Sequence, residues 1–414
     1  MTFKTVSIIG LGYIGLPTAA VLASRGVHVI GVDVNTHAVD TVNSGRVHIV
    51  EPDLDALVSD VVRQGLLRAT TRPEAADAFV IAVPTPFRDE HVPDLSYVEA
   101  AAKAIAPVLQ AGNLVILEST SPVGATEQLA AWLAEARPDL TFPQNSGEAA
   151  QIQVAYCPER VLPGKVLSEL VENDRVVGGV TPACARRAAD LYRVFVKGEC
   201  LITNARTAEM CKLTENSFRD VNIAFANELS LICDELDISV WELIRLANHH
   251  PRVSILQPGP GVGGHCIAVD PWFIVHSSPQ RARLIRTARE VNDSKPHFVA
   301  GRITEAAAAH PAPVIACLGL AFKPDIDDLR ESPAVEIVHM LATHAAGRLL
   351  VVEPHVDQLP PALRGLQNVE LTSAHSAIEQ AQVVAMLVNH RAFYGITKAQ
   401  LQGKRVIDTR GVWQ

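Results

Sequence analysis

The 414 residues are 48% apolar and 20% charged, which provides enough apolar material for the cores of two or three globular domains. A formal charge of -9 leaves no general basic field for nucleic acid or anionic lipid, so an anionic ligand requires a local cluster of cations. The seven cysteines include no CxxC pair, which argues against a metal site or a disulfide framework and for a reducing, cytoplasmic location.

An apolar run near the start of the chain resembles a secretory signal. It extends from residue 6 to residue 23 behind Lys4, but three glycines and Pro17 interrupt it. We therefore interpret this run as the first strand and helix of the fold. Elsewhere no uncharged apolar stretch reaches the ~18 residues needed to span a bilayer, so we expect no membrane insertion.

The first 120 residues alternate short β-branched runs with helical patterns, which indicates βαβ units. The expected strands cover residues 5–9, 27–32, 78–82 and 114–118. One helix is expected to open at Ile14, and another to span residues 95–109. A loop over 141–153 then leads to strands at 152–156 and 175–177.

Residues 207–238 are predicted to form one long helix, because the segment contains almost no helix breakers. Its apolar positions are Leu213, Phe218, Val221, Phe225, Leu229 and Ile232. A helix of ~30 residues commonly bridges two domains or forms a subunit interface. This helix carries more apolar surface than one small domain normally covers, so we expect a homodimer.

After a linker at 310–313 the βαβ pattern returns, with strands expected at 314–318, 348–352, 383–387 and 405–407. We therefore predict an α/β fold with two Rossmann-like, doubly wound domains joined by a central helical segment that contains the long helix. The expected bounds are 1–203 for the first Rossmann-like domain, 204–309 for the central segment and 310–414 for the second Rossmann-like domain.

Gly10, Gly12 and Gly15 follow the first predicted strand and open the first helix. The first glycine permits a tight turn, the second lets backbone amides approach a pyrophosphate, and the third allows helix and strand to pack closely. Asp33 ends the second strand, where its carboxylate accepts hydrogen bonds from a ribose diol and repels a 2′-phosphate. We therefore expect NAD rather than NADP. The alternatives are FAD and a glycine turn without a ligand.

Small hydroxyl side chains follow two further strands. Thr85 lies in the first of these loops and Thr120 in the second, and open parallel sheets bind ligands beyond the carboxyl ends of their strands. We expect these threonines to contact the cofactor or a water molecule, although turn formation explains Pro, Ser and Thr there equally well. Tyr13, Ile14 and Thr126 complete the expected cofactor site.

Residues 259–264 contain four glycines, and Cys266 follows directly. Glycine costs backbone entropy, which is tolerated where the backbone approaches a ligand closely. His265 precedes the thiol, and Asp270 lies four residues beyond it. If a helix begins near Gly264, its amide dipoles and a neighbouring cation favour the nucleophilic thiolate. For the other six cysteines we expect buried apolar packing.

A nucleotide-binding fold combined with a nucleophilic thiol predicts two successive oxidations of one alcohol. The alcohol loses a hydride to NAD and becomes an aldehyde, and the thiol then adds to give a hemithioacetal. A second hydride leaves to a second NAD, and water releases a carboxylate from the thioester. Lys212 and Asn216 share one helix face, with Arg219 three residues further, so they are candidates to stabilise an alkoxide or oxyanion. A solvated helix face is the alternative.

The motifs GLGYIG, STSPVG, PER, KLTEN, GVGGHC, LAFK and DLRES resemble those of the UDP-glucose/GDP-mannose dehydrogenase family along essentially the whole chain. The sequence is most similar to the branch that oxidises UDP-N-acetyl-D-mannosamine at C6, making UDP-N-acetyl-D-mannosaminuronate for bacterial surface polysaccharides such as enterobacterial common antigen. Arg160 replaces an aromatic residue of the UDP-glucose branch, and Val269 replaces a lysine of that branch.

UDP-N-acetylglucosamine and UDP-glucose are the alternative substrates within the family. A two-electron hydroxyacid dehydrogenase and a silent NAD-binding regulator are the alternatives from other classes.

The resemblance implies roles for individual residues. Cys266 would be the thioester nucleophile, with Lys212 and Asn216 holding the oxyanion, while Asp270, Glu159 and Thr120 position or activate water. The residues implied around the UDP-sugar are Arg160, Val161, Lys212, Asn216, Arg219, His250, Arg252, Gly263, Lys323 and Arg410. Arg330 would contact a cofactor phosphate, the third domain would close over UDP, and the central helix would form the dimer.

Five of these implied contacts are cations, which supply the local field that a pyrophosphate requires in an acidic protein: Arg160, Arg219, Arg252, Lys323 and Arg410. A further arginine run is spaced as one helix face, and we expect it to be a solvated stripe: Arg281, Arg283, Arg286 and Arg289.

Overall fold

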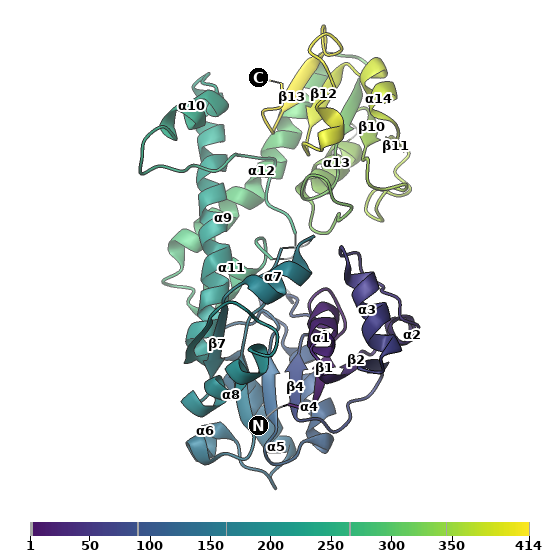
Figure 1. Ribbon diagram of the computed structural model, residues 1–414. Helices are drawn as coiled ribbons and strands as arrows, with labels where there is room; N and C mark the ends of the chain where they lie inside the picture. Colours follow the sequence, from purple (N-terminus) through teal and green to yellow (C-terminus); the bar gives the residue numbers. More distant parts are fainter. Residues whose placement is uncertain (1–2, 89–90, 163, 265, 345, 414) are drawn as a thin grey trace. The chain divides into compact units, whose positions relative to one another are not determined.

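The computed structural model describes residues 3–88, 91–162, 164–264, 266–344 and 346–413. These residues form two compact units, Met1–Thr214 and Glu215–Gln414, and the division falls inside the long helix α9 (Ala205–Glu235). Figure 1 shows α9 as the teal helix that joins them in sequence. Within the described residues, none of the helices combines the length and the apolarity needed to cross a bilayer.

The first unit contains an eight-stranded sheet in the order β3-β2-β1-β4-β5-β6-β7-β8. Its strands are β1 (Thr5–Ile9), β2 (His28–Val32), β3 (Leu67–Thr70), β4 (Ala78–Ile81), β5 (Leu114–Leu117), β6 (Gln153–Tyr156), β7 (Arg175–Gly179) and β8 (Cys200–Asn204). All neighbours are parallel except β6 and β7. Val6 pairs with Val29 and Ala78, which sets the register of the centre of the sheet.

Helices cover both faces of this sheet, as a doubly wound fold requires. One face packs against α1 (Gly15–Ser24), α2 (Thr36–Asn43), α3 (Leu54–Arg63), α7 (Val166–Glu172) and α8 (Pro182–Tyr192). The other packs against α4 (Ser96–Ile105), α5 (Ala125–Ala136) and the start of α9. Burial on both faces explains why β4 and β5 are continuous apolar runs rather than alternating ones.

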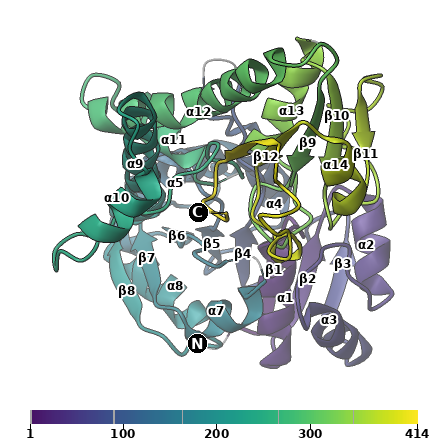
Figure 2. The ribbon, with the colours of Figure 1, turned by 90° about the horizontal axis from the view of Figure 1, so that it is seen from above.

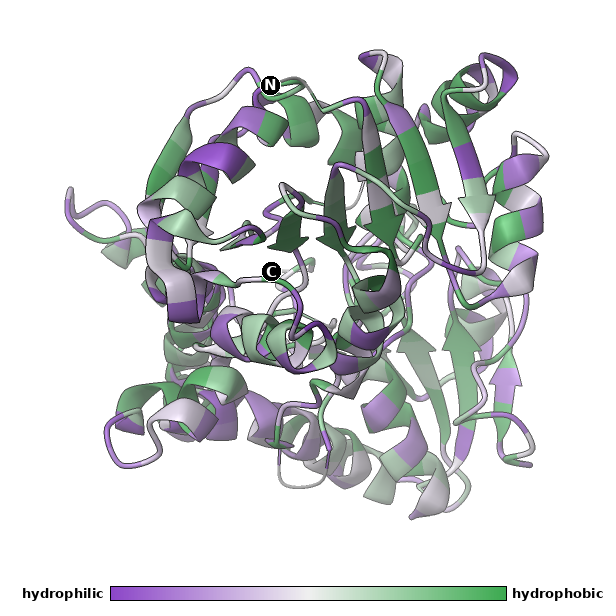
Figure 3. Ribbon diagram, turned by 90° about the horizontal axis from the view of Figure 1, so that it is seen from below, coloured by the Kyte–Doolittle hydropathy of each residue, from purple (hydrophilic) through white to green (hydrophobic). Residues whose placement is uncertain are grey.

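The second unit contains helices α10 (Val240–Ala247), α11 (Asp270–Ser277) and α12 (Arg283–Ala308) before a five-stranded parallel sheet. The sheet order is β11-β10-β9-β12-β13, with β9 (Val314–Leu318), β10 (Arg348–Val352), β11 (Val369–Leu371), β12 (Val383–Met386) and β13 (Arg405–Asp408). The helices α12 and α13 (Pro333–Thr343) cover one face, and α14 (Ala374–Gln380) covers the other (Figure 2). The strands of both sheets are mainly apolar (Figure 3).

The two sheets share one local design at their first turn. Gly10 and Gly319 have φ angles of 95° and 92°, and their N–H groups donate to the carbonyls of Val32 and Val352, both at 2.8 Å. An acidic residue ends the second strand in each case and accepts the next N–H of the turn: Asp33 from Leu11, and Glu353 from Leu320. Two Rossmann-like units are therefore present, as predicted.

Several elements differ from the sequence prediction. The strands β3, β8 and β11 were not predicted, and each lies at the edge of its sheet, where apolar patterning is weak. The expected loop at 141–153 contains the short helix α6 (Pro143–Ser146) and a 3₁₀ turn (Gly147–Ala149). The prediction of a solvated arginine stripe was wrong for Arg289, whose side chain is buried against Asp220.

Candidate active site

The glycine turn after β1 has the shape of a dinucleotide cradle. A Cβ at Gly15 would lie 1.8 Å from the carbonyl oxygen of Gly10, and a Cβ at Gly10 would lie 2.5 Å from that of Ala82. Nothing lies within 4 Å of a Cβ at Gly12. The first and third glycines therefore allow the chain to pack, whereas the second faces open space, as the approach of a pyrophosphate requires.

Besides its predicted contact with the ribose, the carboxylate of Asp33 holds the backbone of this turn. One oxygen accepts the Leu11 N–H at 2.9 Å and the other accepts the Asn35 N–H at 2.8 Å. Each carboxylate oxygen has two acceptor positions, so the residue retains capacity for a ribose diol. Tyr13 is exposed and Ile14 half-buried in the same turn. The residues present therefore fit a dinucleotide.

Two hydroxyls tie the loops after β4 and β5 together. Thr85 Oγ1 donates to the Thr120 carbonyl at 2.5 Å, and Ser119 Oγ donates to the Val83 carbonyl at 2.7 Å. The loops therefore support each other at the carboxyl end of the sheet, and the Thr120 side chain is half-buried there.

Thr126 is fully buried at the start of α5. Its N–H and its hydroxyl both donate to Glu209 of α9, at 2.8 Å and 2.6 Å, and Glu209 also accepts the Gly124 N–H at 2.6 Å. Burial raises the pKa of Glu209 in spite of these bonds. The carboxylate of Glu209 thus caps the first turn of α5. The hydroxyl of Thr126 is one of the groups that this carboxylate binds.

Glu159 belongs to a buried ionic cluster that was not predicted. One of its oxygens pairs with Arg175 at 2.6 Å, the other accepts the Arg160 N–H at 2.7 Å, and both side chains of the ion pair are almost fully buried. Glu118, at the end of β5, accepts the Tyr192 hydroxyl at 3.1 Å. Burial, together with the nearby charge of Glu159, raises the pKa of Glu118 to about 8. In the sequence, this cluster is indicated only by charged residues at the ends of predicted strands, such as Glu118 after β5 and Arg175 at the start of β7.

The loop that carries Arg160 and Val161 is fixed by a distant carboxylate. Glu51 accepts the N–H groups of Gly164 and Val166 at 2.9 Å and 2.8 Å, and its side chain is buried. Arg160 and Val161 are both half-buried, and the Arg160 guanidinium donates to the Asp174 carbonyl. The loop therefore has a defined position in the first unit.

In the second unit, the glycines before Cys266 pack closely against the segment after β9. A Cβ at Gly263 would lie 2.4 Å from the Glu331 carbonyl oxygen. Gly264 has a φ of 81°, and its Cβ would lie 3.0 Å from the Phe322 ring. Larger residues do not fit at either position, which explains the glycine content of this segment.

Cys266 lies in a hydrogen-bonded turn. Its carbonyl accepts the N–H groups of Val269 and Asp270 at 3.1 Å and 2.8 Å. We expected the thiolate to be favoured if a helix began near Gly264. In the described residues the helix α11 begins only at Asp270, so this helix start is absent there. The Cys266 side chain is half-buried, and His265 lies outside the described residues. Of the six other cysteines five are buried, as expected, whereas Cys211 is half-buried.

Asn216 and Asp270 are brought together although 54 residues separate them. The Asn216 side-chain amide donates to the Asp270 carboxylate, which is 3% exposed. Lys212 is half-buried and precedes Asn216 by one helical turn of α9. The predicted catalytic residues Asn216 and Asp270 therefore form one hydrogen-bonded pair.

The Arg410 guanidinium contacts two backbone segments of the second unit. Its Nε donates to the Leu387 carbonyl at 3.1 Å, and its Nη1 would lie 2.7 Å from a Cβ at Gly259. Burial lowers the pKa of Arg410 to about 10, so the guanidinium is still charged at neutral pH. The terminal nitrogens of a guanidinium can donate two parallel hydrogen bonds to a phosphate or carboxylate.

The remaining predicted contacts are exposed side chains of the second unit: Arg219, His250, Arg252, Lys323 and Arg330. His250 Nδ1 accepts the Arg252 N–H at 3.3 Å, and Arg330 forms an ion pair with Asp328 at 2.6 Å.

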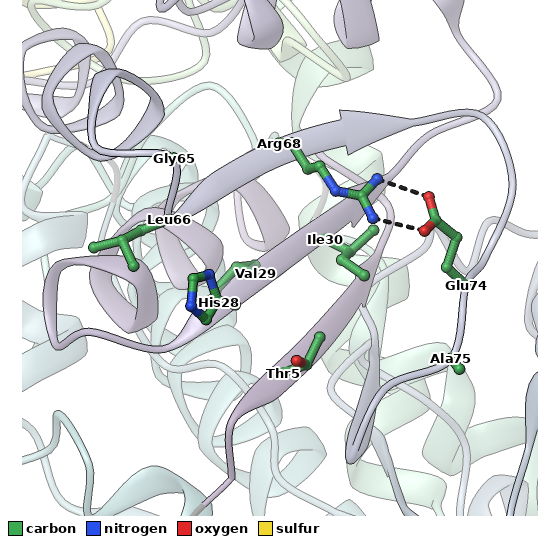
Figure 4. Close-up of a pocket in the computed structure, with 9 residues that line it drawn as sticks. All are labelled: Thr5, His28, Val29, Ile30, Gly65, Leu66, Arg68, Glu74 and Ala75. Atoms are coloured by element: carbon green, nitrogen blue, oxygen red, sulfur yellow. Dashed lines mark hydrogen bonds and ion pairs between the residues drawn. The ribbon is translucent and has the colours of Figure 1, made fainter.

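A hollow of about 270 Å³ lies toward the amino ends of β1, β2 and β3 (Figure 4). Arg68 and Glu74 line one side of it and form a doubly bonded ion pair at 2.7 Å and 2.6 Å. Because ligands of such sheets bind at the carboxyl ends of the strands, this hollow is separate from the site described above.

The chain matches three successive domains described for the UDP-glucose/GDP-mannose dehydrogenase family. Residues 4–196 match its NAD binding domain, residues 206–294 its central domain and residues 316–414 its UDP binding domain. The first match identifies NAD as the cofactor of the first unit, as Asp33 had indicated.

Two characterised sequences and one solved structure are similar over nearly their whole lengths. An NDP-N-acetyl-D-galactosaminuronic acid dehydrogenase of Ralstonia nicotianae is 66% identical, covering 99% of this chain and 96% of that protein. A UDP-N-acetyl-D-mannosamine dehydrogenase of Yersinia pestis is 65% identical, covering 100% of both. The structure of a UDP-D-ManNAc dehydrogenase from Pyrococcus horikoshii has a TM-score of 0.87 at 38% identity, covering 99% of this chain and 96% of that one.

Proposed function

The chain belongs to the UDP-glucose/GDP-mannose dehydrogenase family, and we propose that it oxidises UDP-N-acetyl-D-mannosamine at C6 to UDP-N-acetyl-D-mannosaminuronate, reducing two NAD for each product. The similarity to the Yersinia protein over the full length of both chains supports this substrate most directly. The Ralstonia relative is named for another N-acetylated uronic acid, so an N-acetylhexosamine is common to both. UDP-N-acetylglucosamine and UDP-glucose are the competing substrates.

The proposed chemistry assigns one role to each residue of the site. NAD, which the glycine turn and Asp33 would hold, would supply the hydride acceptor for each of the two oxidations. Lys212 and Asn216 stabilise the alkoxide and the later oxyanion, and Cys266 forms a hemithioacetal and then a thioester with C6 of the sugar. Water then releases the carboxylate, with Asp270, Glu159 and Thr120 as the groups that orient it or hold its proton. The bond between Asn216 and Asp270 supports the shared site.

The UDP moiety requires cations and close backbone contacts. We assign its pyrophosphate to the field of Arg160, Arg219, Arg252, Lys323 and Arg410, with Val161, His250 and Gly263 around the rest of the sugar nucleotide. The hydrogen bond from Arg410 Nε to the Leu387 carbonyl, and the position of the guanidinium over Gly259, support its part in this assignment. On the cofactor side we keep Gly10, Gly12, Gly15, Tyr13, Ile14, Asp33, Thr85, Thr126 and Arg330.

The decisive experiment counts NADH per molecule of product across a panel of UDP- and GDP-sugars. We expect two NADH per uronate, with UDP-N-acetyl-D-mannosamine giving the highest kcat/KM, and NADP substituting poorly because Asp33 repels its 2′-phosphate. One NADH and a ketone product would identify a hydroxyacid-type enzyme. No turnover with any sugar nucleotide would identify a regulator. A higher kcat/KM with another N-acetylhexosamine would reassign the substrate.

We propose that the protein is a homodimer formed through α9. Phe218, Phe225 and Ile232 recur every seven residues on this helix, and their side chains are 70%, 51% and 45% exposed. A row of large apolar side chains in water is typical of a subunit interface.

Light scattering at micromolar concentration should give twice the mass of one chain, and the double variant Phe218→Glu, Phe225→Glu should give the mass of one chain. A wild-type monomer would contradict the proposal, and Val50→Glu, at an exposed apolar residue elsewhere, is the control.

We also propose a cytoplasmic location and a product that serves bacterial surface polysaccharide synthesis. The seven cysteines all carry free thiols, which supports a reducing compartment.

A further inference from the structure

A chain of buried polar side chains joins α9 to α12 in the second unit. Asp220 and Asn227 lie on α9, and Arg289 and Asn292 lie on α12. All four side chains are 0% or 1% exposed. Helices in globular proteins usually pack through apolar side chains, so a polar seam of this kind requires an explanation.

The hydrogen bonds of this seam run in one direction. The Gly259 N–H donates to Asn227 Oδ1, and Asn227 Nδ2 donates to Asn292 Oδ1, both at 2.8 Å. Asn292 Nδ2 then donates to Asp220 Oδ1 at 2.8 Å and to the Asp220 carbonyl at 3.1 Å. Arg289 Nη1 donates to the same carboxylate oxygen at 2.6 Å.

The two ends of the seam decide how each amide is oriented. A backbone N–H can only donate and an ionised carboxylate can only accept, so neither Asn227 nor Asn292 can rotate without losing a bond at both of its ends. Arg289 compensates the charge of Asp220, although burial raises the pKa of that carboxyl. The seam therefore specifies one arrangement of the helices and of Gly259.

Stability alone does not account for this arrangement. Replacing a buried ion pair by well-packed apolar residues is often neutral or stabilising, so such groups are better explained where they fix a geometry. The seam ends at Gly259, which opens the segment leading to Cys266. A Cβ at Gly259 would lie 2.7 Å from Arg410 Nη1, so this backbone is also the surface on which the Arg410 guanidinium rests.

We propose that Asn227 is a positioning residue, which through its bond to Gly259 sets the place of both the Arg410 guanidinium and the segment that carries Cys266. The proposal rests on the function assigned above. It predicts that losing the Asn227 amide disturbs nucleotide binding and thiol reactivity together, although the residue itself contacts neither ligand nor nucleophile.

The same helix interface provides a matched control. Lys295 of α12 is 4% exposed, and its Nζ donates to Ser230 Oγ of α9 at 2.7 Å. Ser230→Ala therefore also removes a partly buried polar contact between the two helices. The Ser230 hydroxyl donates to the main-chain carbonyl of Asn227 at 2.6 Å, but it does not bond the side-chain amide that leads to Gly259. If the role of Asn227 is purely structural, Asn227→Ala and Ser230→Ala should change ligand affinity, thiol reactivity and turnover equally for the same loss of melting temperature.

The test uses full-length Asn227→Ala, Asn292→Ala and Ser230→Ala, with three readouts: UDP affinity by calorimetry, the rate of Cys266 alkylation identified by mass spectrometry, and kcat and KM. For Asn227→Ala we expect kcat to fall by about 10- to 100-fold, because a displacement of about 1 Å costs that much in oriented catalysis. UDP affinity should fall and the alkylation rate should change. Asn292→Ala should show smaller changes of the same sign, and Ser230→Ala none beyond its melting temperature.

Unchanged UDP affinity and alkylation in Asn227→Ala, or equal changes in Ser230→Ala, would overturn the proposal. If Asn227→Ala does not fold, Asn292→Ala decides in its place, and wild-type values for all three readouts overturn it. UDP affinity and thiol reactivity do not depend on the sugar that is oxidised. A protein that fails the sugar-nucleotide panel but shows these two changes would therefore disprove the proposed function and leave the role of Asn227 standing.

Discussion

Replacing Cys266 with alanine should reduce uronate formation by roughly 1000-fold or more, while the first oxidation is much less affected. The first hydride leaves from an alcohol, which needs only orientation and a proton acceptor. The second leaves from a covalent hemithioacetal, which cannot form without the thiol. Incubation with UDP-N-acetyl-D-mannosamine and NAD, followed by mass spectrometry, should show an aldehyde-level product and at most one NADH for each molecule consumed.

Two further variants make this result specific. Cys266→Ser should trap an ester that hydrolyses slowly, because a serine alkoxide is a poorer leaving group than a thiolate. Cys233→Ala removes a buried thiol of α9 and should keep wild-type stoichiometry. Uronate formation by Cys266→Ala at close to the wild-type rate would refute thioester catalysis at this residue.

Replacing Lys212 with alanine should slow both oxidations by ~100-fold or more, since each step develops negative charge on an oxygen that an ammonium can stabilise. The half-buried position of Lys212 on α9 makes this contact stronger than a fully solvated lysine would provide. Single-turnover measurements of NADH formation separate the two steps. Lys212→Arg should recover only part of the rate, because the guanidinium is larger and its donors are fixed in a plane.

The matched control for Lys212 is Arg206, six residues earlier on the same helix. Its guanidinium forms an exposed ion pair with Glu127 at 2.6 Å, and exposed pairs contribute little to stability. Arg206→Ala should therefore leave both rates unchanged. If Lys212→Ala slows the second oxidation alone, its charge acts on the thioester step and not on the alkoxide; if it slows neither, the lysine belongs to a solvated face.

Patterns close together in the sequence were enough to predict the fold. The glycine turn at Gly10–Gly15, followed by Asp33 at the end of the next strand, indicated NAD binding, since the turn, the strand and the helix are neighbours in the chain. Apolar runs gave β1, β9 and β10 with the bounds that the structure has. Local periodicity works there because each strand is buried on both faces.

Contacts between residues distant in the sequence could not be predicted in the same way. The helical spacing of Arg289 is equally compatible with solvent and with burial, and only the position of Asp220, 69 residues earlier, decides between them. The ion pair of Glu159 with Arg175 and the capping of α5 by Glu209 are of the same kind.

The sequence by itself therefore determined the α/β class and the cofactor, and it predicts Cys266 as the nucleophile, because each of these depends on residues within one strand-turn-helix unit or one loop. Only the tertiary structure decided which polar groups are buried and what each one bonds. The physical reason is that a buried amide or carboxylate is stable only with a partner of matching donor or acceptor type, and the fold brings that partner from another helix or strand. Asn227 is the clearest case: its sequence context is an ordinary helix, and its position between Gly259 and Asn292 exists only in the folded chain.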